Sequence, residues 1–312
     1  MVRPCILLLV LAIMLHPARA AYQTTIAADY SGNTGAIDKV KPLNVARGGH
    51  GINSDLTWMP SFYDKLAEVG VREFRIDWLL SDGFYSVVSR NGSGQLVYDF
   101  SRLDQVILPL AQRGIKPIMC MTYMASALGP SNGAPNNYGE YRATVRAYVR
   151  HYLSAGYSGW SWESHNEPEG FTTLTPGQTY QIYKAFATAV KEVDATARVG
   201  GYGAVGSDWS AYMGTFLNLY KADRDAGTAP PMDFFSTHQY GGDDLAQVTF
   251  AGNSFFSRGL TPPDIYLTEW NNSFGAGTFE GNAGTRGGPH GQGGLLWHAP
   301  SCEKPMEYAR PY

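Results

Sequence analysis

The amino-acid sequence predicts an α/β fold of the (β/α)8 TIM-barrel type, and three observations support this prediction. Short apolar runs alternate with longer amphipathic runs along most of the chain. Successive apolar runs begin roughly 30 to 43 residues apart, which is the size of one strand–helix unit. Neither a Gly-rich phosphate loop nor a dinucleotide fingerprint follows any of the runs, which favours a barrel over a doubly wound sheet with the same alternation.

The apolar runs are the predicted strands of the barrel. They begin near Leu43, Glu73, Lys116, Gly159, Arg198, Asp233 and Asp264. In a parallel barrel all strands end at the same face, and enzymes with this fold place their active sites there. Side chains that close these runs are therefore the first candidates for function.

The segments between the strands predict helices that face the core. Leu103, Val106, Ile107 and Leu110 follow the i, i+3, i+4, i+7 spacing of a helix, and Gly114 follows as a stop signal. A second stripe of this kind consists of Tyr141, Val145, Tyr148, Val149 and Tyr152. Thr175-Pro176 predicts the capped start of a third helix.

The eighth strand–helix unit has no clear counterpart in the sequence. After Phe274 the chain becomes Gly-rich and loses its apolar period, which leaves residues 275–312 as an unassigned tail behind a barrel at residues 21–274. A truncated or aberrant C-terminus is the favoured explanation, and a divergent final unit with a long loop is the alternative. Without an eighth strand, the first and seventh strands are expected to keep unpaired edges.

The first 20 residues have the pattern of a secretory signal peptide. Arg3 precedes an apolar run at 6–15, and Ala18-Arg19-Ala20 forms a small-x-small cleavage site. A membrane anchor is the alternative, although the run is too short to span a bilayer comfortably. We therefore expect a secreted, extracellular protein with no membrane partner. Loss of Arg3 and Arg19 shifts the formal charge from -3 to -5, and this mild acidity argues against nucleic acid as a partner.

The three cysteines show neither a disulfide framework nor metal-ligand spacing. Cys5 belongs to the expected signal peptide, and Cys302 lies in the tail. Cys120 lies in an apolar run, where a buried thiol is expected. The sequence therefore predicts no metal site.

Two glutamates stand out because each closes a predicted strand. Glu167 lies in Asn166-Glu167-Pro168 after the fourth strand, and Glu269 ends the seventh. Retaining glycosidases use two carboxyl groups about 5–5.5 Å apart, one as acid and base and the other as nucleophile. A single glutamate at a strand end can also cap the next helix, but Pro168 restricts the turn and Asn166 can bond a sugar hydroxyl. The pair predicts a carbohydrate substrate and chemistry that needs no cofactor.

The chain resembles glycoside hydrolase family 39, the β-xylosidase and α-L-iduronidase family of the clan A barrels, whose acid/base lies in an Asn-Glu-Pro motif. Beyond the two glutamates, the segments that carry the resemblance are YDFSRLDQVILPLAQRGIKPIM, YKAFATAVKEVDATARVGG, MDFFSTHQY and PDIYLTEWNNSF. They fall within residues 43–274, and the order of several segments makes the resemblance specific.

The resemblance implies roles for particular positions. Glu167 is the expected acid/base, Glu269 the expected nucleophile, and Asn166 the expected partner of the sugar 2-hydroxyl. His238 and Tyr240 are expected beside the nucleophile in contact with the sugar, although a buried structural histidine is the alternative for His238. The other residues expected to bind substrate are Tyr123, Arg75 and Trp270.

Two departures from the family pattern leave the identity of the sugar open. His165 precedes Asn166 where many members carry Trp, and Arg75-Ile76-Asp77-Trp78 stands where xylosidase members have a turn with His and Gly. Arg75 and Asp77 are expected either to line the pocket or to form a structural ion pair. A retaining, β-xylosidase-like hydrolase of poly- or oligosaccharides is the first hypothesis. An inactive carbohydrate-binding product of an incomplete barrel is the alternative.

Overall fold

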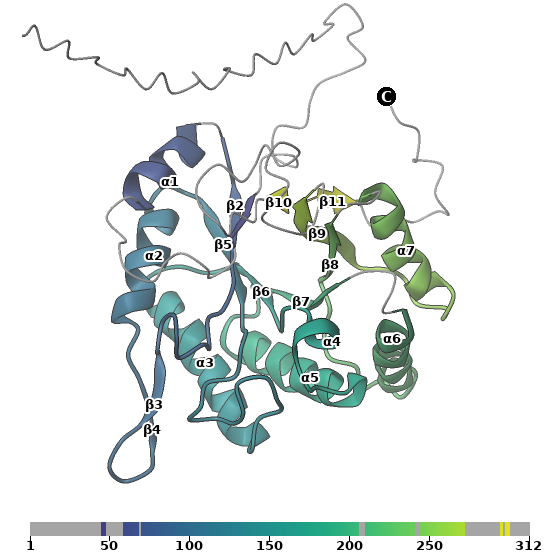
Figure 1. Cartoon of the computed structure of the whole chain (residues 1–312), viewed down its shortest axis with the longest axis horizontal. Helices are drawn as coiled ribbons and strands as arrows, with labels where there is room; N and C mark the ends of the chain where they lie inside the picture. Colours follow the sequence, from purple (N-terminus) through teal and green to yellow (C-terminus); the bar gives the residue numbers. More distant parts are fainter. Residues whose placement is uncertain are drawn as a thin grey trace, which may run out of the picture. The chain divides into compact units, whose positions relative to one another are not determined.

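The computed structural model describes residues 45–47, 59–68, 70–205, 210–240, 244–271, 294–295 and 297–299. The expected signal peptide at residues 1–20 and most of the tail at residues 275–312 lie outside the described residues. Figure 1 shows the strands of the main sheet at the centre and the long helices around their outer side. Among the described residues, no helix combines the length and apolar character needed to cross a bilayer.

Strands and helices alternate along the chain as the sequence predicts. The strands of the main sheet are β1 (Val45–Arg47), β2 (Glu73–Ile76), β5 (Lys116–Cys120), β6 (Ser161–Glu163), β7 (Arg198–Ala204), β8 (Phe234–Tyr240), β9 (Asp264–Asn271), β10 (Gly294–Leu295) and β11 (Trp297–Ala299). The helices are α1 (Met59–Glu68), α2 (Ser101–Gln112), α3 (Tyr138–Ser154), α4 (Pro168–Phe171), α5 (Pro176–Val193), α6 (Ser210–Asp225) and α7 (Asp244–Phe256). A hairpin of β3 (Val88–Arg90) and β4 (Leu96–Tyr98), which the sequence did not indicate, precedes α2.

The main sheet has the strand order of a barrel. Seven strands run parallel in the order β1, β2, β5, β6, β7, β8 and β9. Four of them begin at the predicted residue, and β1, β6 and β8 begin one or two residues later. The barrel prediction is therefore confirmed for these seven strands.

The eighth position of the barrel is aberrant, as predicted, but it is not empty. β10 pairs antiparallel with β1, and β11 pairs antiparallel with β9, so these two short strands cover both edges of the parallel sheet. The prediction that these edges remain unpaired is wrong. The apolar run Leu295-Leu296-Trp297 in the otherwise Gly-rich tail was the signal for a strand. Unpaired N–H and C=O groups at a strand edge are unfavourable, and even a short antiparallel segment can form hydrogen bonds with them.

The predicted helical stripes lie in the core. The four apolar residues of α2 and the five of α3 are all buried. At the start of α5, the Thr175 hydroxyl accepts a hydrogen bond from the Gln178 N–H at 3.2 Å, and the Gln178 side chain reaches back to the Thr175 N–H. This capping box fixes the helix start that Thr175-Pro176 predicted.

A second, smaller apolar cluster consists of Ile118, Phe234 and Tyr266, from β5, β8 and β9. The rings of Phe234 and Tyr266 stack with their centroids 4.4 Å apart. A Cβ atom at Gly200 in β7 would lie 2.0 Å from the Phe234 ring, so this position requires glycine. Packing of this kind between the strands gives the polar residues at their ends a rigid base.

Candidate active site

Glu167 is held in a turn that follows β6 and leads directly into α4. Its backbone has φ 43° and ψ 51°, the left-handed region that residues other than glycine rarely adopt. Its N–H donates to the Gly203 carbonyl at 2.8 Å, and the Gly203 N–H donates to the His165 carbonyl at 2.8 Å. Pro168 then starts α4 with a φ suited to the first helical turn. The strained conformation costs about 1–3 kcal/mol and fixes the direction of the Glu167 side chain.

Glu269 owes its position to an irregularity in the pairing of β8 with β9. Thr237 pairs with Leu267, but the next residue, His238, pairs with Glu269, so Thr268 is bulged out of register. A bulge of this type changes which side chains of two strands face each other. Here it places Glu269 opposite His238.

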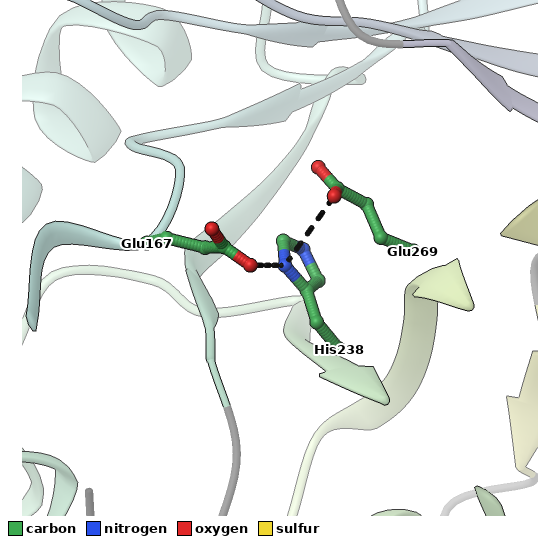
Figure 2. Close-up of side chains that lie close together, drawn as sticks. All are labelled: Glu167, His238 and Glu269. Carbon is green, nitrogen blue, oxygen red and sulfur yellow. Dashed lines mark hydrogen bonds and ion pairs between the residues drawn. The ribbon is translucent and has the colours of Figure 1, made fainter. Parts of the chain in front are cut away.

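The His238 ring lies between the two carboxylates (Figure 2). Its Nδ1 is 2.6 Å from Glu167 Oε1 and 3.8 Å from Glu269 Oε2. One side-chain atom from each of Glu167, His238 and Glu269 can be chosen so that all three lie within 4.8 Å of one another. All three residues are buried. The structure thus brings together three of the predicted site residues from three different strand ends.

The charge state of His238 follows from these neighbours. Burial alone lowers the pKa of its imidazole, but the Glu269 and Glu167 carboxylates outweigh burial and raise the pKa to about 9. His238 is therefore protonated at neutral pH, with Nδ1–H donating to Glu167 and Nε2–H to the Thr268 hydroxyl at 3.1 Å. Gly203 leaves room for the ring, because a Cβ there would lie 2.7 Å from His238 Nε2.

Among the described residues, the same three side chains also lie close enough together to hold a metal ion. A protonated imidazole has no lone pair for a metal, so binding a cation here requires His238 to lose its proton. The short hydrogen bond from His238 to Glu167 competes with that loss. The arrangement suits proton transfer between the two residues better than metal coordination.

Arg75 is the centre of a buried polar network at the end of β2. Its guanidinium donates to Glu163 Oε2 at 2.7 Å, to Glu269 Oε1 at 2.9 Å and to Asn166 Oδ1 at 2.7 Å. It also lies 3.4 Å from the Cys120 thiol. Although burial opposes its charge, Glu163 and the other acidic groups raise the pKa of Arg75 well above its ordinary value. Arg75 therefore places a permanent positive charge against Glu269.

The structure decides between the two expectations for Asp77. In the described part of the chain, Arg75 forms ion pairs with Glu163 and Glu269 and none with Asp77. Asp77 is almost fully buried, and its carboxylate accepts a hydrogen bond from the Trp78 N–H at 2.6 Å. Burial is the main cause that raises the pKa of Asp77 to about 7. The prediction of a structural ion pair between Arg75 and Asp77 is therefore wrong, and Arg75 forms its ion pairs with Glu163 and Glu269.

Asn166 and Tyr123 line the site beside Glu167. Because Arg75 can only donate, the Asn166 atom that faces it must be Oδ1, which turns the amide N–H group the other way. That group donates to the Tyr123 hydroxyl, whose pKa burial raises above its ordinary value. Tyr123 meets His165 edge-on with centroids 5.7 Å apart. Burial lowers the pKa of His165 to about 4, so this neighbour of Asn166 is neutral.

Two predicted site residues can be placed only by their backbone. Tyr240 and Trp270 belong to β8 and β9, where Tyr240 pairs with Asn271 and Trp270 with Gln239. The side chains of Tyr240 and Trp270 lie outside the described residues.

Sequence reasoning missed Glu163 and Glu169. Glu163 is fully buried in β6 and forms an ion pair with Arg75. In the sequence, a charged residue inside the apolar run before Asn166 could have indicated a buried, paired carboxylate. Glu169 lies in α4 and is also buried, and its Oε1 accepts from the Val205 N–H at 2.7 Å. Burial is the main cause that raises the pKa of Glu169 to about 7. No pattern in the sequence distinguished Glu169 from an exposed helix residue.

The chain matches the family model described as glycosyl hydrolases family 39 over residues 43–253. A β-xylosidase from Caldicellulosiruptor saccharolyticus is 27% identical over 242 residues, covering 66% of this chain and 47% of the relative. A β-xylosidase from Geobacillus stearothermophilus is 28% identical over 222 residues, covering 65% of this chain and 43% of the relative. The chain thus spans about half the length of the curated relatives it matches.

Solved structures share the fold. A monomeric β-xylosidase from Caulobacter crescentus CB15 superposes with a TM-score of 0.64 at 23% identity, covering 78% of this chain and 54% of that chain. A GH39 enzyme from Xanthomonas axonopodis pv. citri superposes with a TM-score of 0.63 at 22% identity, covering 77% of this chain and 53% of that chain. Both likenesses agree with the barrel that the strand order shows.

Proposed function

Because the chain belongs to glycosyl hydrolase family 39, we propose that it is a secreted, retaining glycoside hydrolase that cleaves poly- or oligosaccharides. The observation that carries this proposal is the spacing of its two strand-end glutamates. An oxygen of Glu167 lies within 4.8 Å of an oxygen of Glu269. Retaining enzymes need about 5–5.5 Å between the carboxyl groups, whereas inverting enzymes need about 6.5–9.5 Å to admit a water molecule. The observed spacing therefore supports double displacement.

Glu269 is the nucleophile in this proposal. Arg75 holds one of its oxygens at 2.9 Å and favours the ionised form. In the first step a Glu269 oxygen bonds to the anomeric carbon while the glycosidic bond breaks, and the electrons of that bond pass to the glycosidic oxygen. Glu167 transfers to this oxygen the proton that it receives from His238 Nδ1, and the leaving group departs as an alcohol.

Glu167 then reverses its role. As a carboxylate it removes a proton from water, whose oxygen attacks the anomeric carbon and releases Glu269 from the glycosyl ester. His238 suits this exchange, because its Nδ1 lies 2.6 Å from Glu167 Oε1 and can share the proton that Glu167 must lose and regain. When Glu269 forms the ester it loses its negative charge, which makes the protonated form of His238 less favourable.

A β-xyloside is the proposed substrate class, since both curated relatives are named β-xylosidases. His165 and Asp77 both lie at the site and depart from the family pattern, so sugars related to xylose belong in the first panel. The pairing of β10 and β11 with the two sheet edges and the presence of both carboxylates favour an enzyme over the inactive carbohydrate-binding alternative. Secretion rests on the signal-peptide pattern of residues 1–20.

The test is hydrolysis of aryl β-glycosides, β-xyloside first, by the purified mature chain. Glu167→Ala and Glu269→Ala are expected to abolish turnover of a substrate with a poor leaving group. The matched control is Glu68→Ala, because Glu68 lies exposed on α1. The product anomer is followed by NMR during the first minutes, and the β-anomer must appear first. Initial release of the α-anomer, or unchanged activity of Glu269→Ala, would contradict the mechanism.

A further inference from the structure

Phe171 is the most exposed large apolar side chain in the described part of the chain. Its exposed fraction is 52%, against 39% for both Val97 and Phe256. A single exposed apolar residue needs no explanation by itself. Phe171, however, is the last residue of α4, the single turn of helix that starts immediately after Glu167.

The position of the Phe171 ring is tied to that of Glu167. The Phe171 N–H donates to the Glu167 carbonyl at 3.1 Å, which is the i to i+4 bond of a helical turn. Glu167 is the N-cap of this turn and has a left-handed backbone, so the hydrogen bond fixes the Phe171 backbone one turn after Glu167. The ring is therefore displayed within one helical turn of the proposed acid/base.

The segment after Phe171 is anchored rather than loose. The Thr172 hydroxyl donates to the Pro168 carbonyl at 2.6 Å, and it accepts from the Leu174 N–H at 3.1 Å. Thr173 donates from its N–H and its hydroxyl to the Asn132 carbonyl, at 2.8 and 3.1 Å. Asn132 lies in the connection between β5 and α3, at the same end of the barrel as Glu167. An exposed ring on an anchored turn loses little conformational freedom when it binds a ligand.

The chemistry of the site indicates which part of a substrate the Phe171 ring would contact. The acid/base must lie beside the glycosidic oxygen, so the departing half of the substrate lies on the Glu167 side of the cleaved bond. Pyranose rings present faces of C–H groups that pack on aromatic rings, and Phe171 offers such a surface without a competing hydrogen-bond group. We propose that Phe171 is the stacking platform for the leaving-group sugar of an oligosaccharide substrate. This inference rests on the proposed function and names a binding position for the second sugar.

The experiment compares two substrates that share one transferred sugar and differ in the leaving group. A β-glycosyl fluoride has no ring to stack, whereas the corresponding β-linked disaccharide has a full second sugar. Phe171→Ala is expected to lower kcat/KM for the disaccharide about tenfold and to leave the fluoride within about twofold. Phe171→Trp restores stacking and is expected to keep disaccharide activity near that of the parent protein.

Phe256→Ala is the matched control. Phe256 is 39% exposed and ends α7, so it lies at the face of the barrel opposite the strand ends that carry the site. This variant is expected to leave both substrates unchanged. If Phe171→Ala lowers kcat/KM equally for the fluoride and the disaccharide, or changes neither, Phe171 is not a stacking platform for the leaving-group sugar. Failure of the parent protein to hydrolyse any glycosyl fluoride would instead overturn the proposed function itself.

Discussion

Glu167 and Glu269 are identical side chains at the ends of two parallel strands, yet the protein holds them in different ways. Glu269 lies against the guanidinium of Arg75 at 2.9 Å, deep in a network that also contains Glu163. Glu167 lies on a backbone turn where its own φ is 43°. Its partner is His238, whose Nδ1 is 2.6 Å from Glu167 Oε1. One glutamate faces a permanent charge and the other a titratable one.

This difference supports the two roles proposed for the glutamates. A nucleophile must stay ionised through the pH range of the reaction, and Arg75 provides that by a charge that no pH in this range removes. An acid that later acts as a base must exchange its proton, and a histidine partner permits such exchange. Retaining hydrolysis needs both properties within about 5 Å. Both side chains are glutamates, so the partner of each carboxylate, rather than its residue type, determines the chemistry proposed for it.

The largest expected effect is on stability, from Arg75→Met. Removing the guanidinium leaves Glu163 and Glu269 buried without their cation, which costs about 3–5 kcal/mol of the free energy of unfolding. Urea unfolding measures this loss. Arg142→Met is the control, because its ion pair with Glu192 is about four-tenths exposed and contributes less than about 1 kcal/mol. Similar losses for the two variants would mean that the buried network does not hold Glu269 in place.

His238 provides the next effect, which depends on pH. The folded-state pKa of about 9 exceeds the unfolded value of 6.5, so the folded protein binds more protons between these values. The stabilisation is fully present below pH 6.5 and is lost as the pH rises towards 9, by about 2 kcal/mol between pH 7 and 9. Asp77 and Glu169, with pKa values of about 7, titrate mainly below this window.

Unfolding of the parent protein and of His238→Asn at pH 7 and pH 9 tests this expectation. The parent protein is expected to lose stability over this interval, and the variant is expected to lose much less. A parent protein whose stability rises from pH 7 to pH 9 would mean that His238 is not held protonated between the two glutamates.

Glu163→Gln removes a charge from the Glu269 side while keeping the oxygen that accepts from Arg75 at 2.7 Å. We expect a loss of about 1.5 kcal/mol in unfolding free energy, because the ion pair becomes a hydrogen bond from the Arg75 guanidinium to a neutral amide oxygen. With Glu163 neutral, Arg75 pairs only with Glu269 and makes that carboxylate a weaker nucleophile. The rate of glycosyl-enzyme formation from an activated aryl glycoside should therefore fall. An unchanged rate would show that Glu163 supports only folding.

Glu169 provides the smallest effect and acts on the Glu167 side. Glu169→Ala removes the acceptor of the Val205 N–H and costs about 1 kcal/mol. Because this bond ties α4 to the end of β7, the turn that holds Glu167 should loosen. Activity on poor leaving groups, which need the acid, is expected to fall more than activity on good ones. Glu169→Gln keeps an acceptor oxygen and is the control, and equal losses on both substrate types would exclude a link to Glu167.

Local patterns in the sequence were enough to predict most of the barrel and its family. The stripe Leu103, Val106, Ile107 and Leu110 required one helical face against a core, and the structure buries all four residues. Asn166-Glu167-Pro168 and the segments around it indicated glycoside hydrolase family 39, and the match over residues 43–253 confirms that assignment. Patterns of this kind are set within one or two helical turns or one strand, so a single sequence displays them.

The missed features depend on contacts between distant segments. Glu163 and Arg75 are 88 residues apart, and nothing local in either run shows that they pair. The bulge at Thr268 becomes apparent only from the register of β8 against β9. The pairing of β10 and β11 with the edges of the sheet was missed because a strand of two or three residues has no measurable alternation.

In the proposed mechanism Glu269 bonds to the sugar and Glu167 does not, and trapping the covalent intermediate distinguishes the two residues. A 2-deoxy-2-fluoro glycoside with a good leaving group slows both steps, and the second more, so that the glycosyl-enzyme accumulates. Peptide mass spectrometry then locates the sugar. We expect the label on the peptide that contains Glu269, with labelling still seen in Glu167→Ala. A label on Glu167 would contradict the proposed roles, as would steady turnover of the sugar without any covalent adduct.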